Sequence, residues 1–91
     1  MNFEFKSSFD RSVKSLSPQE KKEVKELCIC LIDILSGEGE ISPGLGLKRL
    51  RKCYWEIRKG IKHRILFKWE GDSIEFILAG GHDAIKKQLK S

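Results

Sequence analysis

Apolar and polar side chains alternate with a period of two in several stretches of the chain, and each such stretch predicts a strand. At the N-terminus, Phe3 and Phe5 lie on one side of an extended backbone and polar residues lie on the other, as in a half-buried strand. Residues 73–79 instead form a nearly continuous apolar run, which is typical of a strand at the centre of a sheet. The expected strands are residues 1–6, 47–50, 54–58, 63–70 and 73–79.

After the first strand the pattern changes to the period of an amphipathic helix. The clearest local pattern is Ser17-Pro18-Gln19-Glu20, which places a serine at the N-cap, a proline at the first helical position and a glutamate at the third. This arrangement is a capping box. An apolar stripe follows it until Gly37, which ends the helix. A short helix closes the chain, with Asp83 as its expected N-cap. The expected helices are residues 9–16, 18–35 and 84–90.

The order of these elements predicts the fold class. Strands and helices are segregated along the chain, in the order β-α-α-β-β-β(-β)-α, rather than alternating regularly. This order favours an α+β fold with a mainly antiparallel sheet and a helix hairpin packed on one face. The other face is then left free to be the basic one. The 91 residues are expected to form one domain, residues 1–91.

The charge is concentrated in one part of the chain. The formal net charge is +5, and nine of the eighteen Lys and Arg residues lie within residues 48–68, where Glu56 is the only acid. Most of this segment is the predicted hairpin of residues 54–68. A sheet surface with so strong a positive field is suited to a polyanionic partner.

The composition also bears on location. No apolar run approaches the roughly 20 residues that span a bilayer, and the first residues lack the apolar core of a signal peptide. We therefore expect a cytoplasmic protein with no membrane partner. The three cysteines are odd in number and are expected to be reduced and packed as small apolar side chains.

The chain resembles the RelE/ParE superfamily of type II toxins. The resemblance covers essentially the whole chain and depends on the order of elements and on the motifs GLGLKRLR, YWEIR, HRILF, EGD and FILAGGHD. For the RelE-like branch it implies an endonuclease that cuts mRNA in the ribosomal A site and thereby inhibits translation. For the ParE-like branch it implies a toxin that targets DNA gyrase without nuclease chemistry. In both branches the protein partner is a cognate antitoxin.

Metal-free RNA cleavage uses the ribose 2′-hydroxyl as the nucleophile, and it requires a base, an acid and cations on the phosphate. The resemblance places the arginine that holds the phosphate at Arg64, whose planar guanidinium can bind two phosphate oxygens at once. The alternative for Arg64 is a solvated surface side chain. A basic residue is also implied at Arg58. No metal ion and no cofactor is implied.

His82 is the expected acid or base, because histidine is the side chain that ordinarily changes charge near neutral pH. The resemblance implies a catalytic histidine at this point, with Asp83 either orienting the ring or capping the helix. Strict alternation along residues 73–79 places His82 on the core side of the sheet, unless a bulge or turn at Gly80-Gly81 redirects it. Glu56 is either a second base or the partner of Arg58 in a surface ion pair.

Other basic and aromatic residues of the hairpin and its lead-in are expected to contact the RNA backbone without sequence preference. Trp55 and Trp69 are expected to belong to the core, whereas Tyr54 is a candidate for stacking on a base. The expected nucleic-acid-binding residues are Lys48, Arg49, Arg51, Lys52, Tyr54, Lys62 and Lys68.

Two features depart from the nuclease pattern of the superfamily. The segment GLGLKRLRK before the YW strand contains no acid, and no tyrosine follows the histidine or lies in the last helix. Three functions therefore stay open. The first is a ribosome-dependent mRNA endoribonuclease, the second is a gyrase-inhibiting toxin, and the third is an attenuated or non-catalytic nucleic-acid-binding member of the same fold.

Overall fold

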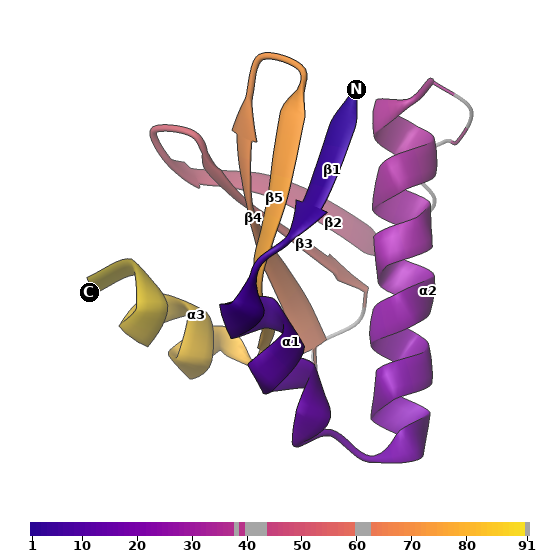
Figure 1. Ribbon diagram of the computed structural model, residues 1–91, viewed down its shortest axis with the longest axis vertical. Helices are drawn as coiled ribbons and strands as arrows, with labels where there is room; N and C mark the ends of the chain where they lie inside the picture. Colours follow the sequence, from indigo (N-terminus) through magenta and orange to yellow (C-terminus); the bar gives the residue numbers. More distant parts are fainter. Residues whose placement is uncertain (38, 40–43, 60–62, 91) are drawn as a thin grey trace.

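The computed structural model describes residues 1–37, 39, 44–59 and 63–90. One five-stranded sheet has the order β1-β5-β4-β3-β2, in which β1 runs parallel to β5 and the other neighbours are antiparallel (Figure 1). The predicted α+β class with a mainly antiparallel sheet is confirmed. The elements are β1 (Asn2–Phe5), α1 (Ser7–Lys14), α2 (Pro18–Leu35), β2 (Leu45–Arg51), β3 (Tyr54–Lys59), β4 (His63–Glu70), β5 (Ser73–Gly80) and α3 (His82–Lys90).

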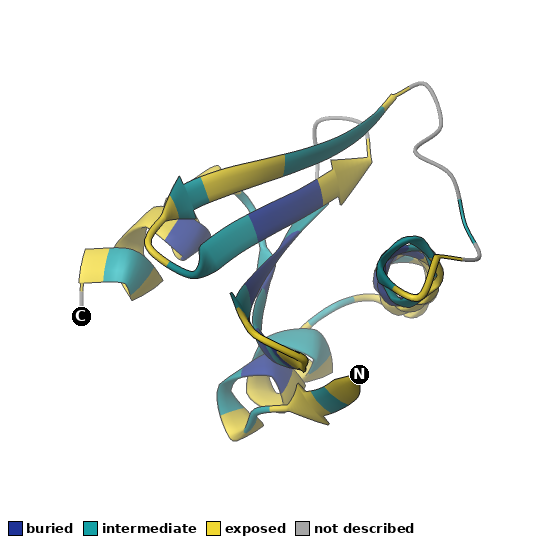
Figure 2. Cartoon of the chain, turned by 90° about the horizontal axis from the view of Figure 1, so that it is seen from above, coloured by how far each residue is buried: buried dark blue, intermediate teal, exposed yellow. Residues whose placement is uncertain are grey.

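The helices α1 and α2 pack on one face of the sheet and enclose the core, as the amphipathic pattern predicts (Figures 1 and 2). The predicted capping box is confirmed, since the Ser17 side chain accepts from the backbone N–H of Glu20 and the Glu20 carboxylate accepts from the backbone N–H of Ser17. Among the described helices, none is long and apolar enough to cross a membrane. The buried core comprises Phe9, Val24, Leu27, Cys28, Leu31, Ile57, Ile65, Phe67, Ile74, Phe76 and Ala79.

The opposite face of the sheet carries α3 (Figure 2). Leu66 alternates with Ile65 and Phe67, which belong to the core on the helix-hairpin side, so its fully buried side chain lies on the other face. Residues of α3 cover it, and Ile85 of this helix is 3% exposed. The expectation that this whole face is free is therefore wrong. Only the parts beside α3 remain open to a ligand.

The end of β5 and the start of α3 differ from the sequence prediction. The helix begins at His82 rather than at Ala84, so Asp83 lies in its first turn and is not its N-cap. The backbone N–H of Ile85 donates to the Gly81 carbonyl at 3.2 Å. A side chain at Gly80 would place its Cβ 3.1 Å from the Ala84 Cβ, so the missing side chain lets the helix start close against the strand.

A β-bulge in β5 changes which side chains face α3. Leu66 pairs with Leu78 and Phe67 pairs with Phe76, so Ile77 is an extra residue between them. From Leu78 onward the side chains therefore point to the opposite face from the one that strict alternation predicts. The bulge lies at Ile77, not at Gly80-Gly81 as the sequence suggests.

Two serines of α1 bind the backbone at this bulge. The Ser8 hydroxyl donates to the Ile77 carbonyl at 2.6 Å, and the backbone N–H of Ala79 donates to the Ser12 hydroxyl at 3.0 Å. A bulge leaves backbone groups without ladder partners, and buried groups of this kind are costly unless they are bonded. The first helix therefore stabilises the irregularity that later directs His82.

Candidate functional site

Two arginines and two glycines form one row across the sheet on the α3 face. Gly46 of β2 pairs with Arg58 of β3, Arg58 pairs with Arg64 of β4, and Arg64 pairs with Gly80 of β5. The two arginines are directly opposite one another on neighbouring strands, which is unfavourable for like charges unless an anion compensates them. Gly46 leaves room for the Arg58 side chain, whereas Gly80 leaves room for Ala84 of α3.

A hollow of about 320 Å³ lies over this row, and we call it the arginine hollow. It brings together four of the five predicted catalytic residues, Glu56, Arg58, Arg64 and His82, although they come from three different elements. The predicted RNA contact Lys48 also lines it. Three cationic or basic groups and one histidine thus surround a single opening, which is suited to an anion. The hollow is lined by Gly46, Leu47, Lys48, Glu56, Arg58, Arg64 and His82.

Glu56 is the buried partner of Arg64. Its residue is 5% exposed, and the Arg64 Nη1 lies 3.2 Å from its Oε1 and 3.1 Å from its Oε2. The alternative that Glu56 forms a surface ion pair with Arg58 is wrong, because the carboxylate is buried and bonded one strand further on. A buried ion pair is strongly destabilised when one partner is removed, since the other charge is left without compensation.

The Arg64 guanidinium has a donor that Glu56 does not use. Its Nε is buried and has no hydrogen-bond partner among the described residues. A guanidinium carries five N–H donors in a fixed plane, and Nε lies on the edge away from Nη1. Glu56 therefore fixes one side of the Arg64 guanidinium and leaves another edge for a second acceptor.

Gly46 is a residue of the hollow that the sequence reasoning missed. A Cβ at this position would lie 3.2 Å from both the Cγ and the Nε of Arg58. The Arg58 side chain therefore passes directly over the backbone of β2, through space that any other residue would occupy. In the sequence, the second glycine of GLGLK is the feature that could have indicated a role for Gly46. That role becomes apparent once the pairing of Gly46 with Arg58 is known.

His63 precedes Arg64 and points to the other face, as the alternation predicts. Its Nε2 lies 2.8 Å from the Oε2 of Glu20, the same carboxylate that completes the capping box of α2. The Ser17 backbone N–H, the Ser17 hydroxyl and His63 together lower the pKa of Glu20. This contact ties the start of β4 to the start of α2 and so fixes the strand that carries Arg64.

Several predicted RNA contacts lie away from the arginine hollow. Arg51 donates from Nη2 to the Leu89 carbonyl at the end of α3, and Lys68 forms an ion pair with Glu70 at 3.0 Å. Tyr54 lines a separate cavity of about 110 Å³ beside α3. Asp83 is not among the residues that line the hollow, and Lys62 lies outside the described residues.

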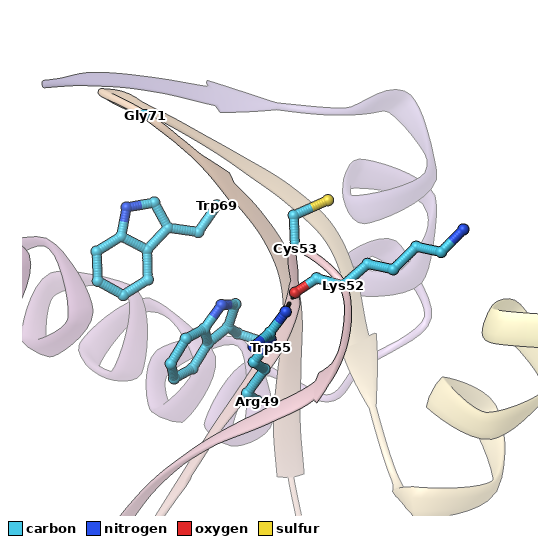
Figure 3. Close-up of a pocket in the computed structure, with 6 residues that line it drawn as sticks. All are labelled: Arg49, Lys52, Cys53, Trp55, Trp69 and Gly71. Carbon is cyan, nitrogen blue, oxygen red and sulfur yellow. Dashed lines mark hydrogen bonds between the residues drawn. The ribbon is translucent and has the colours of Figure 1, made fainter.

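Two further predicted contacts lie on the other face of the sheet. Arg49 pairs with Trp55 and shares its face, which is the face of α1 and α2. Arg49, Lys52, Cys53, Trp55, Trp69 and Gly71 line a second hollow of about 440 Å³, which we call the tryptophan pocket (Figure 3). The basic residues of β2 therefore serve two faces and do not form the single basic surface that the charge pattern predicts.

The arrangement contains no metal centre within the described part of the chain, because no three His, Cys, Asp or Glu side chains there come close enough to hold an ion. The three cysteines carry free thiols. Burial raises the pKa of the Cys28 thiol to about 12, which agrees with its predicted role as a small apolar core residue.

Comparison with solved structures identifies the fold. A chain of the RelB–RelE antitoxin–toxin complex from Methanococcus jannaschii superposes with a TM-score of 0.66 at 21% identity, over 93% of this chain and 96% of that one. A chain of the RelBE2 toxin–antitoxin complex from Mycobacterium tuberculosis gives 0.64 at 16% identity, over 89% and 96%. A metal-bound toxin from Helicobacter pylori gives 0.68 at 16% identity, over 93% and 98%.

Neither a family model nor a curated protein matches by sequence. The structural likeness nevertheless extends over nearly the full length of both partners in each comparison. The protein has the fold of the RelE-like toxins.

Proposed function

We propose that this protein is the toxin of a type II toxin–antitoxin system and that it cleaves mRNA on the ribosome. The observation that carries the proposal is the convergence of Arg58, Arg64 and His82 on one hollow of the α3 face. Arg58 and Arg64 supply the cations, and His82 supplies one of the two proton-transfer groups, that attack of a ribose 2′-hydroxyl on the neighbouring phosphate requires. The fold shared with RelE-like toxins supports the same conclusion.

Arg64 binds the scissile phosphate through the edge of its guanidinium that Glu56 leaves unused. The buried, unpartnered Nε supports this role, since a bound phosphate oxygen gives that donor an acceptor. Arg58, held over Gly46, stabilises the same phosphate from the neighbouring strand. Both contacts strengthen as negative charge accumulates on the phosphate in the transition state.

His82 accepts the proton of the attacking 2′-hydroxyl as the P–O2′ bond forms, and water protonates the 5′-oxygen as the P–O5′ bond breaks. The histidine is the first residue of α3 and lines the hollow beside the two arginines. Its position also places it at a helix N-terminus, where unpaired backbone N–H groups favour a bound anion. Asp83 lies in the first turn of α3, where a carboxylate interacts favourably with the helix dipole, and it takes no part in the reaction in this assignment.

Glu56 acts as a positioning residue rather than as the base. Both of its oxygens are within hydrogen-bond distance of the same Arg64 nitrogen, and the carboxylate lies almost entirely out of solvent. Its contribution is to hold the guanidinium plane in one orientation.

One observation favours a second candidate, an attenuated nuclease that binds RNA but cleaves it slowly. Glu56 compensates part of the charge on Arg64, and a buried negative charge next to a phosphate site opposes phosphate binding. In this candidate the chain keeps the partner antitoxin and the RNA surface, but the rate of the chemical step is low.

The test is induction of the gene in a bacterial host, with translation and DNA integrity followed separately. The proposal expects rapid arrest of translation and transcripts cut within codons on purified ribosomes. His82→Gln is expected to abolish cleavage, whereas Lys22→Ala, an exposed position of α2, is the matched control. Continued translation with DNA damage contradicts the proposal and indicates gyrase as the target. RNA binding with cleavage that is slow in the wild type supports the attenuated nuclease.

A further inference from the structure

The tryptophan pocket is a second prepared surface, separate from the arginine hollow. Trp55 and Trp69 lie side by side with ring centroids 5.2 Å apart and planes inclined at 53°. Both rings pack against the core and line the pocket together with Arg49 and Lys52. The Lys52 side chain extends away from the two rings (Figure 3). A half-buried aromatic pair with basic neighbours has no role in the proposed cleavage, which takes place on the other face.

The rim of this pocket is held in place by the backbone. The Nε of Arg49 donates to the Lys52 carbonyl at 2.7 Å, and the Trp69 backbone N–H donates to the Cys53 carbonyl at 2.8 Å. Lys52 has a φ of 49°, a left-handed conformation that a lysine rarely adopts. A register shift between Arg49 and Arg51 precedes this turn. The position of Arg49 is therefore fixed before any ligand arrives, which lowers the entropy that binding loses.

The chemistry of the pocket fits a protein segment. Tryptophan and arginine are the residues that contribute most often to the centres of protein interfaces. The inclined rings leave no parallel slot between them into which a nucleobase inserts, whereas an aliphatic or aromatic side chain packs against both. Arg49 beside the rings and Lys52 at the outer edge of the pocket favour an acidic ligand. At the Gly71 end of the pocket, the neighbouring Glu70 and Asp72 would repel a carboxylate. The acidic side chains of the ligand are therefore expected at the Arg49 end.

We propose that the tryptophan pocket docks an acidic segment of a partner protein, with an apolar side chain against Trp55 and Trp69 and carboxylates on Arg49 and Lys52. This deepens the proposed function, on which it rests for the partner's identity as the antitoxin. Because the pocket and the arginine hollow lie on opposite faces, the segment binds here without entering the site of cleavage.

Tryptophan fluorescence reports directly on this pocket, because Trp55 and Trp69 are the two tryptophans of the chain. The probe is a synthetic peptide of about twelve residues, rich in Glu and Asp with a central Leu-Phe pair, titrated against the full chain. A peptide with lysines in place of the acids, and an oligouridine, serve as comparison ligands. Binding of the acidic peptide is expected to shift tryptophan emission to shorter wavelength, with an affinity that falls as salt is added.

Charge reversals at three positions distinguish binding in this pocket from a general effect of positive charge. Lys52→Glu is expected to weaken peptide binding at least about tenfold, equivalent to about 1.4 kcal/mol. Arg49→Glu is expected to do the same, and Lys52→Glu is the safer variant because the Lys52 side chain has no bond within the described residues. Lys48→Glu makes the same charge change as Lys52→Glu. Lys48 directly precedes Arg49 but lies on the opposite face of the sheet, so this variant is expected to leave peptide binding unchanged.

The inference is overturned if the acidic peptide leaves the emission unchanged or if Lys48→Glu weakens binding as much as Lys52→Glu. It is also overturned if oligouridine changes the emission and Lys52→Glu abolishes that change, since the pocket then binds nucleic acid. Cleavage assays on the same variants keep the two proposals apart. If the wild type binds the peptide but cleaves no RNA, the nuclease proposal is contradicted and the docking proposal is still supported.

Discussion

The arginine hollow and the tryptophan pocket lie on opposite faces of one sheet and share a single basic strand. Lys48 of β2 lines the first and Arg49, the next residue, lines the second. The arginine hollow encloses a buried carboxylate and a histidine, whereas the tryptophan pocket has an aromatic floor and an exposed basic rim. Alternation along a strand thus converts one run of like charges into two surfaces with different chemistry.

The difference extends to how each arginine is held. Arg64 is bound to a buried carboxylate, so its charge is partly compensated and its orientation is fixed. Arg49 is bound to a backbone carbonyl, so its full charge remains available to attract a partner. A compensated, oriented cation is suited to a reaction in a confined space, and an uncompensated rim cation is suited to attracting and orienting a partner from solution. The bonding partner of each arginine therefore distinguishes the two sites more than the exposure of its side chain does.

The largest expected effect comes from exchanging the two arginines for lysine one at a time. Arg64→Lys keeps a positive charge beside Glu56 but loses the planar fork, so cleavage is expected to fall about 100-fold. Arg49→Lys, the matched change in the tryptophan pocket, is expected to leave cleavage within about twofold, because it lies on the other face. The measurement is single-turnover cleavage of mRNA on programmed ribosomes. Equal losses in the two variants contradict the separation of the two sites.

The second effect concerns stability and tests the role of Glu56. Glu56→Ala leaves the Arg64 guanidinium without its buried partner and is expected to lower the free energy of unfolding by about 3 kcal/mol. Glu56→Gln keeps an oxygen that accepts from Nη1 and is expected to lower it by about 1 kcal/mol. Urea unfolding measures both. If Glu56→Gln is stable but inactive, and the acid limb of its pH–rate profile disappears, then Glu56 is a base and not a positioning residue.

The smallest expected effect is a loss of stability in acid that involves neither pocket. The Ser17 backbone and side chain, with His63, lower the pKa of Glu20, and Lys6 lowers the pKa of Glu75. Each carboxylate therefore stabilises the fold fully above the ordinary pKa of 4.5, and this contribution is lost as the pH falls through the lowered value. Urea unfolding between pH 7 and about pH 3 is expected to show a gentler decline in Glu20→Gln and Glu75→Gln. An unchanged decline in both variants refutes these assignments.

Much of the fold follows from short-range patterns in the chain. Apart from β2, which begins at Leu45 rather than at residue 47, the strands lie close to where the pattern of apolar and polar residues places them. The helix α2 begins at the Ser17 capping box. These features depend on contacts within a few residues, which is why they can be read locally. The candidate site residues Glu56, Arg58, Arg64 and His82 also meet in one hollow, as a sheet with Arg58 and Arg64 on one face allows.

The roles within that hollow required the tertiary structure. Glu56 bonds to Arg64 rather than to Arg58, because the register of β3 and β4 and the burial of the carboxylate decide its partner. Gly46 contributes only because β2 brings it opposite Arg58. Such pairings join residues that are distant in the sequence, and no local pattern encodes them.

The position of His82 depends partly on local sequence and partly on contacts between distant segments. The sequence determined that a histidine follows the last strand and precedes a short helix close to a basic hairpin. Strict alternation nevertheless sends it to the core, and only the bulge at Ile77 turns it toward the two arginines. That bulge is stabilised by Ser8 and Ser12 of α1, which lie 69 and 67 residues away from the backbone groups they bind. An extra residue in a strand is stable only when its unpaired backbone groups find partners. Packing of α1 therefore decides to which face the side chains after Ile77 point.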